Sequence, residues 1–158
     1  MHIASRKVLV TGATEHPNCE WIFKVAECIP SMAKQLGLEP PGILVWDNDT
    51  KFTREFDNTL KLEGITPYRL PLQSPLMNPH IERWIKSLKA ECLDHFVSLG
   101  TKHLDHLIGE YVEHFYFERP HQGLGNKPIM RAAPLHNEGD IHYDSRLGGL
   151  LRHYYRAA

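Results

Sequence analysis

The sequence has few cysteines, no long apolar run and almost no net charge. Its three cysteines, Cys19, Cys28 and Cys92, form no paired framework, and an odd, low count is typical of a reducing compartment. No apolar run is long enough to cross a bilayer, and the amino terminus lacks the apolar segment of a signal peptide. These absences predict a cytoplasmic protein that makes no membrane contact.

The charge balance shows no global excess of cations. The 18 Lys and Arg residues offset 19 Asp and Glu residues, for a formal net charge of −1. The chain as a whole therefore lacks the signature of a nucleic-acid binder, although a neutral sum leaves room for local cation clusters. With 42% hydrophobic and 23% charged residues among 158, the composition predicts one globular domain. Aspartate is absent from residues 1–46.

A short apolar run that ends in an acid organises the middle of the sequence. Residues 43–46 lie between a Pro-Pro-Gly turn and a polar turn, a pattern that predicts a buried strand. Asp47 follows this strand directly, and open α/β sheets place their ligands at the carboxyl ends of strands. Asp47 is therefore a candidate for chemistry. Asp49, in the same turn, is either an additional ligand or, as we favour, a turn-stabilising residue.

A second acid lies near the start of a predicted helix. Asn78 followed by Pro79 predicts the helix start, so Glu82 falls in about the first turn, where the helix dipole favours an anion. At about 100° per residue, Glu82, Lys86 and Lys89 share one face. The apolar stripe consists of Ile81, Trp84, Ile85, Leu88 and Cys92. Taken alone, Glu82 and Lys86 indicate a surface ion pair worth a few tenths of a kcal/mol. Because Asp47 lies at the end of a strand upstream, we favour a functional site that contains both acids.

Periodicity predicts the remaining elements. The expected elements are a strand at Lys7–Val10, a helix from residue 17 or 18 that Pro30 interrupts, a helix over 53–62, a short strand over 65–70, and a helix over 102–117. This alternation predicts a layered α/β domain. The tail carries Arg146, Arg152 and Arg156 beside Tyr154 and Tyr155, which indicates either a nucleic-acid contact or, as we favour, a solvated tail.

Three segments together resemble the DDE integrase and transposase catalytic core, the ribonuclease H-like domain of retroviral integrases and bacterial insertion-sequence transposases. These are residues 45–53, which resemble its second acid block, residues 74–83, which resemble its third, and residues 116–124, which resemble the tyrosine and Arg-Pro-His segment that closes the core. The spacing of Asp47 and Glu82 also matches. The combination covers about residues 5–128, and residues 147–151 resemble the C-terminal ends of one environmental branch of these transposases.

The resemblance implies a function and a set of site residues. It implies DNA integration and transposition by metal-dependent phosphodiester cleavage and strand transfer. Asp47 and Glu82 would be the catalytic carboxylates and would hold Mg²⁺ or Mn²⁺, while Arg83, Lys86 and Lys89 would bind DNA. The partners implied are transposon ends and target DNA, and a homo-oligomer when the core is complete.

The resemblance also implies that the chain is an incomplete core. The family uses three carboxylates, the first on the opening strand of the sheet, and no Asp precedes Asp47. We therefore expect an amino-truncated ribonuclease H-like three-layer α/β domain that lacks its first two strands. Its partial core would span residues 1–128, and a loop-rich basic tail would span residues 129–158. Strand transfer by this chain should be feeble or absent.

The missing strands have a structural consequence in this interpretation. In the implied strand order 3-2-1-4-5, Lys7–Val10 would be the third strand and residues 43–46 the fourth, with the two absent strands between them. Each unpaired buried backbone group costs about 1–3 kcal/mol, against a total of about 5–15 kcal/mol for a domain. We therefore expect an exposed edge and either a marginally stable, aggregation-prone monomer or a chain that is stabilised by association.

Two alternatives remain open at this point. One is a non-catalytic remnant that binds DNA or interferes with a full-length transposase. The other is a structural zinc module, for which the possible ligands are Cys92, His95, His103 and His106. His80 and His121 either assist catalysis or, as we favour, have structural roles.

Overall fold

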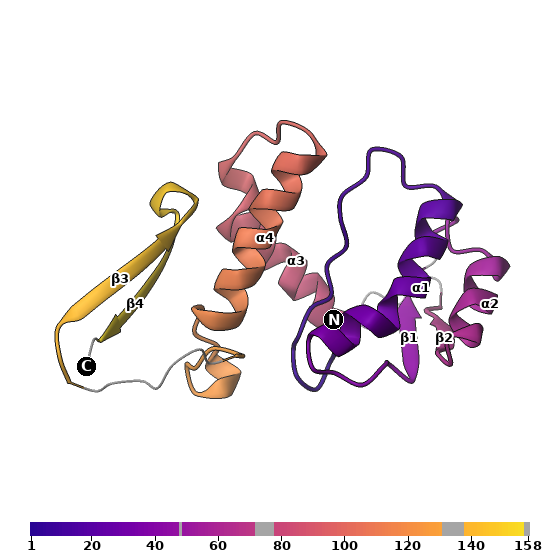
Figure 1. Ribbon diagram of the computed structural model, residues 1–158, viewed down its shortest axis with the longest axis horizontal. Helices are drawn as coiled ribbons and strands as arrows, with labels where there is room; N and C mark the ends of the chain where they lie inside the picture. The colour runs from indigo at the N-terminus through magenta and orange to yellow at the C-terminus, as the bar shows by residue number, and fades with distance from the viewer. Residues whose placement is uncertain (48, 72–77, 131–137, 157–158) are drawn as a thin grey trace. The chain divides into compact units, whose positions relative to one another are not determined.

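The chain has a mixed α/β fold, shown in Figure 1. The computed structural model describes residues 1–47, 49–71, 78–130 and 138–156. Its elements are α1 (Cys19–Gln35), β1 (Ile43–Trp46), α2 (Arg54–Leu62), β2 (Thr66–Arg69), α3 (Pro79–Glu91), α4 (Thr101–Phe117), β3 (Ile141–Arg146) and β4 (Leu151–Arg156), with short 3-10 turns at Leu93–His95, Gln122–Leu124 and Leu147–Gly149. The chain divides into two compact units, one of residues 1–2 and 9–80 and the other of residues 3–8 and 81–158.

The first unit contains a two-stranded parallel sheet. β1 pairs with β2 so that Ile43 lies opposite Thr66 and Trp46 opposite Arg69. Between them, α2 begins after Thr53 and ends before Gly64, whose positive φ of 74° suits glycine at a helix C-terminus. The predicted strands at 43–46 and 65–70 and the helix between them are therefore confirmed.

An aromatic cluster forms the centre of this unit. The Trp46 and Phe56 rings meet edge to face with centroids 5.2 Å apart, and the Phe52 ring lies 5.0 Å from Phe56. The surrounding core contains Ile22, Ala26, Ile29, Leu60 and Ile65. Ile22 and Ala26 belong to α1, Leu60 belongs to α2, and all three share one core with Trp46 of β1. Both helices therefore bury their apolar faces against the same side of the sheet.

The prediction that Pro30 interrupts the first helix is wrong. Asn18 caps α1 by accepting the Trp21 N–H at 2.9 Å, and the helix runs without a break to Gln35. Proline removes one backbone hydrogen bond from a helix. Here Ile29 and Ala33, on either side of Pro30, are both buried, so tertiary packing of one continuous apolar face offsets that loss.

The other side of the sheet is exposed. Ile43 is 62% exposed, Val45 37% and its register partner Tyr68 47%. Parallel sheets are normally covered on both faces. Among the described residues β1 has β2 as its one ladder partner. The open edge, the missing strands and the three-layer ribonuclease H-like sheet stay predictions.

The predicted strand at Lys7–Val10 is wrong. These residues are described and lie outside every strand, and Val8 is buried. The Val8 N–H donates to the Tyr116 hydroxyl at 2.7 Å, and that hydroxyl donates to the Val8 carbonyl. A tyrosine side chain thus satisfies both backbone groups that a neighbouring strand would otherwise pair.

The second unit has a core built by two helices. Trp84 of α3 packs edge-on against Tyr111 and Phe115 of α4, with ring centroids 6.2 Å apart in each pair. Leu88 and Cys92 of the predicted apolar stripe are also buried, whereas Ile85 of that stripe is 40% exposed. α3 begins at Pro79 as predicted. It ends at Glu91, and a 3-10 turn follows at Leu93–His95.

The tail contains a β-hairpin in place of the loops expected from the sequence. β3 and β4 pair antiparallel from Ile141–Arg156 to Arg146–Leu151. Three connecting residues, Leu147, Gly148 and Gly149, have positive φ. Two of them are glycines, which adopt this backbone conformation without steric strain. No helix in the described part of the chain has the length and apolar character to span a membrane.

Candidate functional site

Asp47 lies at the carboxyl end of β1, as predicted. Its side chain is exposed, and its Oδ1 accepts the Asp49 N–H at 3.2 Å. The Asp49 carboxylate binds Lys51 through both the backbone N–H at 2.9 Å and the ammonium at 2.8 Å. The Lys51 hydrogen bond lowers the pKa of Asp49. These contacts support the turn-stabilising role for Asp49 and leave one oxygen of Asp47 outside the turn.

Glu82 and the nearby cations lie on the exposed side of α3. Glu82, Arg83, Lys86 and Lys89 are all exposed, whereas Trp84 between them is buried. Within the described residues, no ion pair joins Glu82 to Lys86. The surface ion pair that a four-residue spacing suggests is therefore not formed. The helix presents a carboxylate and three cations to solvent instead.

The two candidate carboxylates belong to different units. Asp47 lies in the unit of residues 9–80 and Glu82 in the unit of residues 81–158. The convergence of Asp47 and Glu82 therefore stays a prediction, and the part of the third acid block that falls at residues 74–77 lies outside the described residues.

The zinc alternative finds no support in the structure. No group of three or more His, Cys, Asp or Glu side chains in the described ranges is placed to hold a metal ion. Cys92 is fully buried, with its Sγ 3.7 Å from the Leu107 carbonyl, and burial raises its pKa. His103 accepts the Leu99 N–H, and His95 contacts the Ala90 carbonyl.

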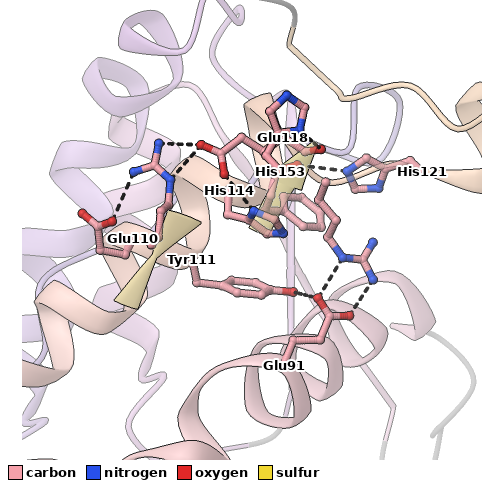
Figure 2. A network of polar contacts seen from close by, with 10 residues as sticks. Glu91, Glu110, Tyr111, His114, Glu118, His121 and His153 are labelled. Carbon is pink, nitrogen blue, oxygen red and sulfur yellow. Dashed lines mark hydrogen bonds and ion pairs between the residues drawn. The ribbon is translucent and has the colours of Figure 1, made fainter. Parts of the chain in front are cut away.

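The half-buried carboxylate of Glu118 joins α4 to the C-terminal hairpin, as Figure 2 shows. The two oxygens of Glu118 bind different partners, His114 Nδ1 at 2.9 Å and the Arg146 guanidinium at 2.7 Å. Arg146 also reaches Glu110 at 3.2 Å, and His153 Nδ1 lies 3.1 Å from the Glu118 carbonyl. Since Arg146 is on β3 and His153 on β4, this cluster fixes the hairpin to the helix.

A second cluster joins α3 to the segment after α4. Arg119 binds Glu91 through two nitrogens, at 2.8 and 2.6 Å, and the Tyr111 hydroxyl donates to Glu91 at 3.3 Å. The Glu91 hydrogen bond raises the pKa of Arg119, and burial next to Glu91 raises the pKa of Tyr111. Such a two-point pair fixes geometry as well as charge.

His121 completes this set with a structural contact. Its Nε2 lies 3.0 Å from the Phe115 carbonyl, and its ring meets the Phe115 ring edge-on at 4.8 Å. Burial lowers the pKa of His121, with the carbonyl contact acting in the opposite direction. The polar side chains of the Tyr-Phe-Glu-Arg-Pro-His segment at residues 116–121 are thus occupied by internal contacts, and these support the structural role favoured for His121.

Comparison with known families gives a match to part of the chain. Residues 63–128 match the integrase core domain. This segment is similar to an integrase core. Curated proteins and solved structures give no match. The integrase core match covers 66 of the 158 residues, counted from 63 to 128, and it includes Glu82 and the 116–121 segment but not Asp47.

The polar side chains within residues 63–128 fall into two groups, which differ in their surroundings. The polar groups of the 116–121 segment are turned toward other parts of the second unit, whereas Glu82, Lys86 and Lys89 face solvent. The first group stabilises the second unit, and the second group is exposed to solvent. The sequence analysis missed the roles of Glu91 and Glu118. Their arginine partners, Arg119 and Arg146, lie 28 residues away in sequence, beyond the reach of any helical or strand period.

Proposed function

We propose that the chain carries the catalytic core of a DDE transposase or integrase, which cleaves and joins DNA phosphodiesters with divalent metal ions. The observation that carries this proposal is the integrase core match over residues 63–128, with Glu82 on an exposed helix face beside Lys86 and Lys89. Asp47, at the end of a parallel strand, is the second carboxylate of the proposed site. The non-catalytic remnant has no separate observation in its favour.

The chemistry of these donors fits a hard cation. Mg²⁺ and Mn²⁺ prefer carboxylate oxygens and keep several water ligands. Asp47 keeps one oxygen outside its turn, and Glu82 makes no ion pair among the described residues. Asp47 and Glu82 would therefore hold the metal. When bound, such ions activate an oxygen nucleophile and stabilise the leaving oxygen.

The cations of α3 have a different role in this proposal. Lys86 and Lys89 lie about one and two turns beyond Glu82, and Arg83 follows it directly. Cations that neutralise phosphates supply most of the sequence-independent affinity for DNA. These three side chains would hold the DNA backbone next to the carboxylates. They would position a phosphate without reading its sequence.

The first prediction concerns metal binding and catalysis. Asp47→Asn and Glu82→Gln should each weaken Mn²⁺ binding by about tenfold or more, since each removes a charged ligand. Asp49→Asn is the matched control, because its carboxylate binds Lys51, and it should leave Mn²⁺ affinity unchanged. Calorimetric titration with Mn²⁺ measures the affinity of all three variants.

The same chain should show no robust strand transfer. The proposed site has two carboxylates, Asp47 and Glu82. DNA joining in Mg²⁺ or Mn²⁺ should stay at the level of Glu82→Gln. Metal-dependent joining that is lost in Asp47→Ala would show that two carboxylates suffice. Mn²⁺ binding that is indifferent to both Asp47 and Glu82 would contradict the site itself.

The second prediction concerns DNA binding by α3. Lys86→Gln with Lys89→Gln should weaken duplex DNA binding and reduce the slope of log affinity against log salt by about two, because each lysine would neutralise one phosphate. Lys24→Gln is the control, since Lys24 is an exposed helical lysine paired with Glu20. Fluorescence anisotropy across a salt series measures the slope. An equal effect in Lys24→Gln would mean that the change reflects overall charge alone.

A further inference from the structure

The C-terminal hairpin has two chemically different faces. Register pairs Ile141 with Arg156, Tyr143 with Tyr154 and Ser145 with Arg152, and directly opposed residues share a face. The face that alternates with it carries Arg146, Leu151 and His153. That second face binds Glu118 and Glu110 through Arg146, and Leu151 is buried. It is therefore the attached face.

The opposite face is exposed and aromatic. Tyr143 is 61% exposed and Tyr154 59%. Their ring centroids lie 5.8 Å apart with an angle of 40° between the planes. Large exposed rings usually mark a binding surface, because burying them in a complex removes much apolar area from water. The pair stands on a rigid support, since the hairpin is held from behind by the buried Glu118 cluster.

Two arginines flank the tyrosine pair, and none of the six hairpin residues on their face is acidic. Arg152 donates from Nε to the Gly149 carbonyl at 3.0 Å, and Arg156 donates from Nη1 to the Gly139 carbonyl at 2.7 Å. Each guanidinium keeps further N–H donors beyond that one anchoring bond. The face therefore combines two positioned positive charges with two rings. This charge complements phosphate.

We propose that this face, which comprises Ile141, Tyr143, Ser145, Arg152, Tyr154 and Arg156, binds single-stranded DNA by stacking unpaired bases on Tyr143 and Tyr154 while Arg152 and Arg156 bind the backbone. Single-strand binders combine aromatic platforms with cations in this way. Duplex bases are already stacked on one another, so the tyrosine faces favour unpaired nucleotides. The proposal goes beyond the carboxylate site and needs no metal.

The test is anisotropy with a labelled single strand of about 15 nucleotides, within the usual site size of such surfaces, in the presence of EDTA. The double variant Tyr143→Leu/Tyr154→Leu should weaken binding about tenfold or more, since it loses stacking on both rings. Tyr143→Phe/Tyr154→Phe keeps both rings and should bind like the unchanged chain. Tyr68→Leu, at an exposed tyrosine of the first unit, should also have no effect.

Several outcomes decide the proposal. Arg152→Gln/Arg156→Gln should reduce the slope of log affinity against log salt for the single strand. A duplex of matched sequence should bind more weakly than the single strand, and the leucine variant should reduce its affinity less. Unchanged affinity of the leucine variant, an equal loss in the phenylalanine variant, or a preference for duplex would overturn the inference. Circular dichroism on each variant confirms folding. Because Lys86 and Lys89 are intact throughout, failure here leaves the proposed function of α3 untouched.

Discussion

Replacing Glu118 with alanine is expected to lower the free energy of unfolding by about 3 kcal/mol, because His114 and Arg146 both lose a charged, largely buried acceptor and Arg146 keeps only the more exposed Glu110. The Glu118 side chain is 11% exposed and binds both His114 and Arg146. Its loss leaves an imidazole and a guanidinium without their main acceptor. It also removes the anchor between α4 and the hairpin.

A matched control is available on the same helix. Glu110 binds the same arginine at 3.2 Å but is 31% exposed, so Glu110→Ala should cost about 0.5–1 kcal/mol, the range of exposed pairs. Denaturant titration gives the free energies, and hydrogen exchange should place the loss of protection in residues 81–156. Equal costs for Glu118→Ala and Glu110→Ala would contradict a special role for the buried carboxylate.

The same cluster sets a pH dependence. Burial disfavours the charged form of Glu118, but hydrogen bonds from Arg146 and His114 outweigh it, and the pKa lies below its ordinary value of 4.5. A lowered folded-state pKa means that the unfolded chain takes up a proton first. The stabilisation is therefore complete above about pH 4.5 and is lost as pH falls through the folded pKa. Glu118→Ala should remove this part of the acid sensitivity.

Phe56→Ala is expected to cost about 3–5 kcal/mol, since it removes a buried aromatic ring and leaves a cavity. Phe56 is 3% exposed and packs against both Trp46 and Phe52. For a unit whose sheet has an exposed face, this is a large share of the usual stability of about 5–15 kcal/mol. The variant should leave residues 9–71 largely unfolded at about 37 °C.

Leu62 on the same helix supplies the comparison. It is 88% exposed, so Leu62→Ala should change the free energy of unfolding by less than about 0.5 kcal/mol. Hydrogen exchange should show lost protection of α1, α2, β1 and β2 in Phe56→Ala, with α4 still protected. Simultaneous loss of protection in both units would mean that the chain unfolds as one cooperative block.

Local patterns predicted the elements whose stability comes from a single apolar face. The apolar period predicts α4, the Asn-Pro pair predicts the start of α3, and the apolar run predicts β1. All three elements are confirmed. The prediction of a strand at Lys7–Val10 was wrong for a physical reason. Its apolar pattern indicated burial correctly, as Val8 shows, but burial does not specify the group that pairs with the backbone. That group is a tyrosine hydroxyl 108 residues away.

The candidate site was predictable in part. Its residue types and the helical phase of Glu82 with Lys86 and Lys89 follow from local sequence, and the integrase core match supports the family on independent grounds. The hairpin was not predicted, because Arg146 gains its role only from Glu118 and Glu110, which belong to another element. Ion pairs between residues far apart in sequence produce no helical or strand periodicity from which they could be predicted.

The bond between Val8 and Tyr116 has a consequence for synthesis on the ribosome. Residues 3–8 leave the ribosome before residues 9–80, yet they belong to the unit that is completed later. At about 5–20 residues per second, roughly 5–20 s separate the translation of Val8 from that of Tyr116. Residues 9–80 have time to fold in this interval, while the segment before them waits without its tyrosine. The nascent chain thus presents Val8 uncovered, and a chaperone can bind this segment until α4 emerges.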